Sequence, residues 1–251
     1  MRATIGKPVI AALVAAIAFG QPSTEKTRNR EFHFTQPKTA PELREPAAVF
    51  RVIAEIPQVI ADDTQNSLAL RGTDGQLALA DWLFHELDTQ GQSYAMHEYR
   101  MPSGGDDVVR VFYLTDAATV QGFQEACTVV RSIGEIRGLV TYNGTRAVVV
   151  RGAAAQIALA DWMFNELDKP GHDASVHEFR MTGAVHNTVR VFYLPQTGAV
   201  QDFQKAAIRI RSKTKIPRLF TYNAPRAIAV RGTAEQIAMV GHLIEQPDSR
   251  Q

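Results

Sequence analysis

The residues that could bind a metal lie in two matched segments. His97-Glu98 and His177-Glu178 occupy equivalent places in MHEYRM and VHEFRM, and His172 and His186 lie near the second pair. A catalytic zinc site needs three ligands that converge on one open position. Adjacent residues of a strand point to opposite faces, so neither His-Glu pair can chelate one ion. The sequence therefore predicts surface histidines, with no metal and no cofactor.

Two pairs of acidic residues could act as general acid and base. Asp81 and Glu86 recur as Asp161 and Glu166 in two copies of one helical segment. Residues five apart do not share a helix face, so we interpret them as solvated helix positions. The sequence also lacks a Gly-x-Ser-x-Gly elbow, a phosphate-binding loop and a dinucleotide fingerprint. We therefore predict that the chain is not an enzyme.

Arginine is the residue type that recurs most strictly at expected surface positions. Arginines can flank strands to block edge pairing and cover apolar surface with their stems, or they can bind the carboxylates of a partner. Both interpretations stay open. The candidate partner-contacting residues are Arg100, Arg110, Arg151, Arg180, Arg190 and Arg231, with Arg30 and Arg71 as counterparts in the first copy.

The charge balance argues against nucleic acid as a partner. Lys plus Arg is 27 and Asp plus Glu is 26, so a net charge of +1 gives no strong field to attract phosphate. Residues 72–75 (GTDG) fit the Gly-x-x-Gly loop of KH domains, but this loop carries an aspartate and the aligned residues 152–155 (GAAA) and 232–235 (GTAE) lack the second glycine. We expect protein partners instead.

The N-terminus predicts export. Arg2 and Lys7 precede an apolar run at residues 9–19, and residues 18–20 (AFG) offer small residues for cleavage. The run is shorter than the roughly 20 residues that a transmembrane helix needs. We expect a signal peptide at residues 1–20, a linker at 21–29, a periplasmic location and no membrane span in the mature chain.

An internal repeat is the strongest signal in the sequence. Gly72, Gly152 and Gly232 stand 80 residues apart, and the same shift aligns RVFYL at 110–114 with RVFYL at 190–194 without a gap. Self-similarity at a fixed period indicates repeated structural units that stack on one another. We expect units at residues 30–101, 102–181 and 182–251.

Each unit can be divided into elements. A short strand such as 110–114 precedes an amphipathic helix, two strands joined by an Asn-Gly turn, and a second helix that ends at Pro170-Gly171. In the first copy we expect the first helix to begin near Pro46 and to be shorter. Residues 94–101 and 175–181 predict an extra linking strand in the first two copies. The fold class is therefore α+β, with three tandem βαββα units in which two helices cover one face of a small mixed sheet.

The pattern resembles the short N-terminal periplasmic domains of bacterial secretins, the pores of type II and type III secretion and type IV pilus systems. The residues that carry the resemblance are Tyr113-Leu114, Gly152-Ala153 with Gly232-Thr233, Gln156-Ile157, and 167–170 (LDKP). The resemblance implies a βαββα fold, ring-building by side-by-side stacking, and contacts with secretion proteins. We expect the chain to lack the pore domain.

These observations favour a non-catalytic periplasmic scaffold that binds protein partners of the envelope, for example as an accessory of a secretion or pilus assembly. It could also form a homo-oligomer. The alternative is a soluble periplasmic enzyme or small-ligand binder whose site lies between units.

Overall fold

The computed structural model describes residues 26–88, 97–102, 105–169, 177–183 and 185–245. The expected signal peptide and His172 lie outside these residues. In the described part, every paired strand is antiparallel and the strands form three sheets, so the sheets are antiparallel rather than mixed. No helix in this part is long and apolar enough to cross a membrane.

The first unit has a sheet in the order β1-β3-β2. Its elements are β1 (Arg28–His33), α1 (Ala40–Val52), β2 (Gln58–Asp62), β3 (Ser67–Gly72) and α2 (Asp74–Asp88). Helix α1 begins at Ala40, well before Pro46, which corrects the expected start, although with 13 residues it is shorter than the 15-residue helices α3 and α5, as expected. The backbone N–H of Thr39 donates to the Glu42 carboxylate at 2.7 Å, and this capping contact starts the helix at Ala40.

The second and third units each have four strands because the linking strand joins the sheet of the unit that follows it. The orders are β4-β5-β7-β6 and β10-β11-β9-β8. The second unit contains β4 (His97–Arg100), β5 (Asp107–Tyr113), α3 (Val120–Gly134), β6 (Gly138–Tyr142), β7 (Ala147–Ala153) and α4 (Ala154–Leu167). The third contains β8 (Glu178–Arg180), β9 (Thr188–Tyr193), α5 (Val200–Thr214), β10 (Arg218–Tyr222), β11 (Ala227–Gly232) and α6 (Ala234–Glu245).

The tight turn between β6 and β7, and its counterparts in the other units, differ from the expected turn. An Asn-Gly pair favours positive φ, but the residue of this turn in the left-handed region is Arg146, at φ 52°. Its counterparts Asn66 and Arg226 have φ 53° and 55°. The turn therefore has the same backbone in all three units despite different residues.

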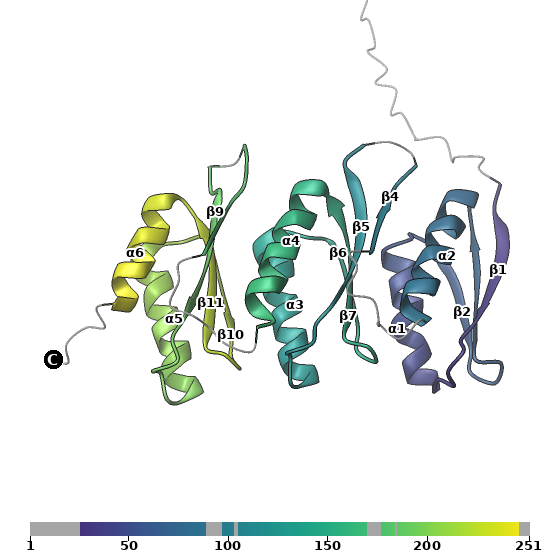
Figure 1. Ribbon diagram of the computed structural model, residues 1–251, viewed down its shortest axis with the longest axis horizontal. Coiled ribbons are helices and arrows are strands. Elements are labelled where there is room, and N and C mark those ends of the chain that lie inside the picture. Colours follow the sequence, from purple (N-terminus) through teal and green to yellow (C-terminus); the bar gives the residue numbers. More distant parts are fainter. Residues whose placement is uncertain (1–25, 89–96, 103–104, 170–176, 184, 246–251) are drawn as a thin grey trace, which may run out of the picture.

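Sheet and helix layers alternate along the whole molecule (Figure 1). The two helices of each unit cover one face of its own sheet. In the first two units their far side packs on the sheet of the next unit: α1 lies against β6, and α3 lies against β10 and β11. The β-sheets of the second and third units are therefore buried on both faces. Three units with two shared seams make one continuous stack.

Candidate functional site

The seams between units are apolar in the middle. Val109, Val111 and Val149 of the second sheet are buried in one cluster with the first unit's Leu79 and Leu83. Val189, Val191 and Ala229 occupy the equivalent places of the third sheet and are buried with the second unit's helices. Burial of aliphatic side chains at both seams supplies most of the adhesion between units.

At one side of each seam, a glutamate of one unit binds an asparagine of the next unit, and we call this contact the carboxylate latch. Glu45 on α1 accepts hydrogen bonds from the backbone and side-chain N–H groups of Asn143, at 2.8 and 2.6 Å. Glu125 on α3 accepts the same two bonds from Asn223, at 2.9 and 3.2 Å. In each case the partners are 98 residues apart, one repeat plus 18 residues. Sequence reasoning missed these residues, although their recurrence at equal separation was a usable signal.

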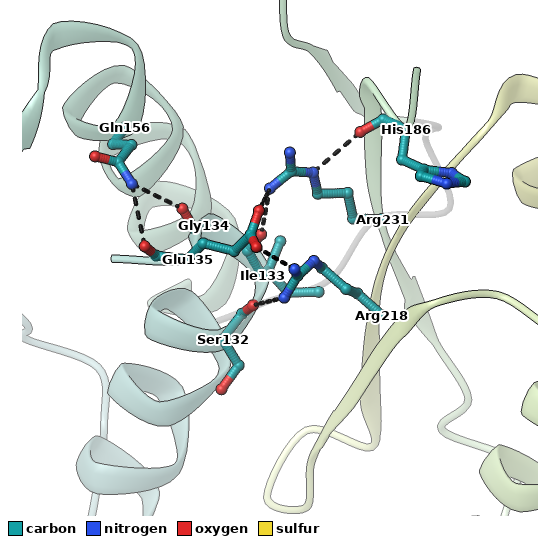
Figure 2. A network of polar contacts seen from close by, with 8 residues as sticks. All are labelled: Ser132, Ile133, Gly134, Glu135, Gln156, His186, Arg218 and Arg231. Atoms are coloured by element: carbon teal, nitrogen blue, oxygen red, sulfur yellow. Dashed lines mark hydrogen bonds and ion pairs between the residues drawn. The ribbon is translucent and has the colours of Figure 1, made fainter. Parts of the chain in front are cut away.

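An arginine latch closes another side (Figure 2). Arg231 on β11 donates to the carbonyls of Ile133 and His186, each at 3.0 Å, and pairs with Glu135 at 3.2 Å. Its counterpart Arg151 donates to the Ile53 carbonyl at 2.7 Å. Both arginines bind carbonyls at the C-terminal end of the preceding unit's helix, where positive charge is stabilised.

Figure 2 also shows a second arginine at the same seam. Arg218 on β10 donates to the Ser132 carbonyl at 3.2 Å and binds the Glu135 carboxylate. Gln156 on α4 donates to the Gly134 and Glu135 carbonyls, each at 3.2 Å. The end of α3 is therefore held both by its own unit and by the next one.

A tyrosine latch reaches the second helix of each preceding unit. The Tyr113 hydroxyl donates to the Glu86 carbonyl at 2.8 Å, and the Tyr193 hydroxyl donates to the Glu166 carbonyl at 2.7 Å. Burial raises the pKa of Tyr113 to about 12, and burial also raises the pKa of Tyr193.

The acidic residues interpreted as solvated helix positions are not all exposed. Glu86 and Glu166 are buried, with 6% and 9% exposure, which corrects that interpretation. The Glu166 carboxylate lies 2.8 Å from the Lys169 ammonium and 3.0 Å from His177 Nδ1. The seam covers the end of the helix, and this burial could not be inferred from helical spacing.

Four of the six candidate arginines have largely buried side chains whose contacts lie within the chain. Arg151 and Arg231 form the seam contacts above. Arg110 lies 2.6 Å from Glu98 and 3.4 Å from Asp161. The hydrogen bond from Arg110 lowers the pKa of Glu98. Arg190 lies over the Phe192 ring at 4.3 Å.

The other two candidates, Arg100 and Arg180, lie at equivalent places on the linking strands β4 and β8. Their side chains are 84% and 74% exposed. Neighbouring glutamates, Glu98 and Glu178, are 3.1 and 3.8 Å away. Among the six, these two present their charge to solvent.

The described residues include a groove of about 620 Å³ beside the hairpin β4-β5 and helix α4. Its charged lining residues are Glu98, Arg100, Asp106, Asp107, Arg110 and Asp161. No group of three or more residues able to hold a metal occurs in the described part of the chain. Arg110 already bridges Glu98 and Asp161, so this charge cluster is held by internal pairing.

Comparison with known proteins returns solved structures only. No family model and no curated protein matches the sequence. The N-terminal domain of the secretin XcpQ from Pseudomonas aeruginosa is 12% identical, with 89% of this chain and 100% of that chain covered at a TM-score of 0.27. A dimeric mutant of the same domain is 13% identical, with 84% of this chain and 77% of that chain covered at a TM-score of 0.28.

Aeromonas hydrophila ExeD is 16% identical at a TM-score of 0.21, and the match covers 90% of this chain but only 42% of ExeD. At these values the matches do not assign the chain to a family. Two of these matched structures are N-terminal domains of a secretin.

Proposed function

We propose that this chain is an exported, non-catalytic scaffold of the bacterial cell envelope that acts as one stiff three-unit rod and binds protein partners along its sides. The observation that carries the proposal is that the next unit's sheet covers the helices of the first and of the second unit, where Val149 and Val191 are buried. Continuous packing of this kind resists bending between units, because bending would expose the buried aliphatic seam to water.

The use of polar residues supports the same proposal. Glu125, Arg231 and Tyr193, which could serve a reaction, are bound to backbone groups of a neighbouring unit. Such contacts fix the orientation of units. A long rigid surface suits a protein that holds partners at set distances, as the resemblance to stacking secretin domains also implies.

Arg100 and Arg180 are the proposed partner contacts. They lie on matched strands of successive units and are mostly exposed. Exposed arginines can bind carboxylates through two parallel hydrogen bonds and are enriched where proteins bind one another. Their repetition would let one partner with repeated acidic groups, or two copies of one partner, bind along the rod.

Site-specific photo-crosslinking in cells tests this proposal. A photoreactive residue at position 100 or 180 should give discrete crosslinks to envelope proteins, identified by mass spectrometry. The same residue at position 110, where the native side chain is enclosed by Glu98 and Asp161, is the matched control. Absence of crosslinks at both exposed positions, together with binding of a small molecule in the groove, would favour the enzyme or small-ligand alternative.

Export is tested separately. If the apolar run is a signal peptide, the chain expressed from residue 1 should be released by osmotic shock. Its N-terminal peptide should then begin after Gly20. Retention of the intact N-terminus in the cytoplasmic fraction would contradict the proposed location.

A further inference from the structure

Among the described residues, the first sheet and the last pair of helices each leave one face without the layer that covers the equivalent face at the inner seams. In the described residues, no helix layer packs on the outer face of the sheet β1-β3-β2, and no sheet follows helices α5 and α6 (Figure 1). Because the repeat has no gaps, each end position has two counterparts at a buried seam. The residues at the ends can therefore be compared directly with residues whose contacts are known.

The outer face of the sheet β1-β3-β2, with its turn, is called the sheet end here. It carries acidic residues where the inner seams have valine, tyrosine and asparagine. Glu31 stands where the inner seams have Val111 and Val191, both buried. Asp62 stands where they have the buried Tyr142 and Tyr222. Asp63 replaces the latch asparagines Asn143 and Asn223. Glu31 and Asp63 are exposed.

The outer side of helix α5 and the residue that follows it are called the helix end here. They carry basic residues where the inner seams have glutamate and aliphatic residues. Lys205 stands where the inner seams have the latch glutamates Glu45 and Glu125. Arg209 and Lys213 replace aliphatic residues, Val129 and Ile133 in the second unit. Lys215 replaces Glu135. Lys205, Lys213 and Lys215 are exposed.

We propose that a second copy of this chain docks head to tail, with the acidic sheet end of one copy against the basic helix end of another. The carboxylate latch supplies the register. At the inner seams a glutamate on the helix binds an asparagine on the turn; at the ends, Lys205 on the helix would bind Asp63 on the turn. The two residues would occupy the same positions as the glutamate and the asparagine of the inner seams, but they would form an ion pair in place of the hydrogen bonds.

Capping for solubility does not account for this pattern by itself. A polar end residue of either sign prevents the stack from aggregating. The sheet end has three acids beside Arg71, and the helix end has four bases beside Asp202, so the two ends carry opposite net charge, as surfaces that meet usually do.

Two positions work against the pairing: Asp202 at the helix end already pairs with Lys205 at 3.3 Å, and Arg71 adds a positive charge to the sheet end. Arg71, the counterpart of Arg151 and Arg231, would approach Lys215, whereas those two arginines pair with glutamates. However, Arg151 and Arg231 also bind the carbonyls of Ile53 and Ile133, and the backbone carbonyl of Lys213 is at the equivalent place for Arg71. The docking should therefore be weak, reversible and sensitive to salt.

The test is a charge swap in the full chain, followed by sedimentation analysis over a range of protein and salt concentrations. The wild-type chain should associate with rising concentration, and added salt should reverse the association. Asp63→Lys alone and Lys205→Glu alone should each weaken self-association about tenfold, because attraction becomes repulsion. The double variant should regain it, and so should an equimolar mixture of the two single variants. Both positions are exposed, so folding should be retained, which circular dichroism would verify.

A chain that stays monomeric at every concentration and at low salt would overturn the inference. So would association that the single substitutions leave unchanged. The inference rests on the proposed scaffold role but uses other surfaces: crosslinks at positions 100 and 180 from a strictly monomeric chain would leave that role standing and remove only the head-to-tail contact.

Discussion

The Glu125 carboxylate on α3 accepts hydrogen bonds from both the backbone and the side-chain N–H groups of Asn223, which follows it by 98 residues. Glu45 binds Asn143 in the same way at the preceding seam. The repeat thus reproduces a contact between units as well as the units themselves. The third unit has Lys205 where the first two have the latch glutamates, so a substitution of Lys205 serves as the control for a substitution of Glu125.

Removing the latch glutamate should destabilise the stack. Glu125→Ala deletes the two hydrogen bonds from Asn223 and an exposed one from Gln121, and we expect a loss of about 2 kcal/mol in the free energy of unfolding. Urea denaturation followed by circular dichroism measures it. Lys205→Ala is the matched control and should cost less than about 0.5 kcal/mol because this side chain is exposed. Equal losses in the two variants would contradict a role for the latch.

Removing the arginine latch should lower the free energy of unfolding more than removing the carboxylate latch. Arg231→Ala leaves the Ile133 carbonyl and the Glu135 carboxylate without a bond that they have in the native chain, at a cost of about 3 kcal/mol. The third unit should then unfold before the other two, giving a second transition in calorimetry. Arg71→Ala, at the equivalent exposed position, should leave a single transition at the wild-type temperature. A single unchanged transition for Arg231→Ala would show that the seam does not depend on this residue.

A charge placed in the apolar seam should separate the first two units. Val149 on β7 is fully buried in the apolar cluster that joins the second sheet to the first unit, so Val149→Asp should cost about 3 to 5 kcal/mol or prevent folding. Ala69→Asp puts the same carboxylate at the equivalent position of the exposed sheet end and should be tolerated. Limited proteolysis distinguishes the outcomes: we expect cleavage between the first and second units in Val149→Asp only. If Ala69→Asp were equally damaging, the sheet end would have to be covered.

The tyrosine latch predicts a loss of stability at alkaline pH. The pKa of Tyr113 is raised from 10.0 to about 12 in the folded chain, so the folded state holds its proton where the unfolded state has lost it. The contribution is complete below pH 10 and is lost as the pH rises from about 10 to about 12. Thermal unfolding at a series of pH values measures this loss.

Tyr113→Phe is the control for that series. It lacks the ionisable hydroxyl and the bond to the Glu86 carbonyl, so it should be less stable at neutral pH and should lose less stability between about pH 10 and about pH 12. Identical pH profiles for the two proteins would contradict the assignment.

The sequence by itself determined the repeat and the elements of each unit. The 80-residue shift without gaps, the helical spacing around Phe123 and the short β-branched strands are local signals, and all of them correspond to observed elements. The seam also left a trace, because residues 147–150 (AVVV) are apolar on both faces of their strand, a pattern typical of a sheet covered on two sides.

Only the tertiary structure decided which element covers the second face of each inner sheet. Periodicity reports which side of an element is apolar, but it does not report which other element meets that side. Glu86 and Glu166 are buried because a neighbouring unit covers the ends of their helices, and Arg110 is enclosed while Arg100 is exposed because one lies inside the sheet and the other at its edge. Contacts between residues 98 apart depend on how units stack, and that relation exists only once the chain has folded.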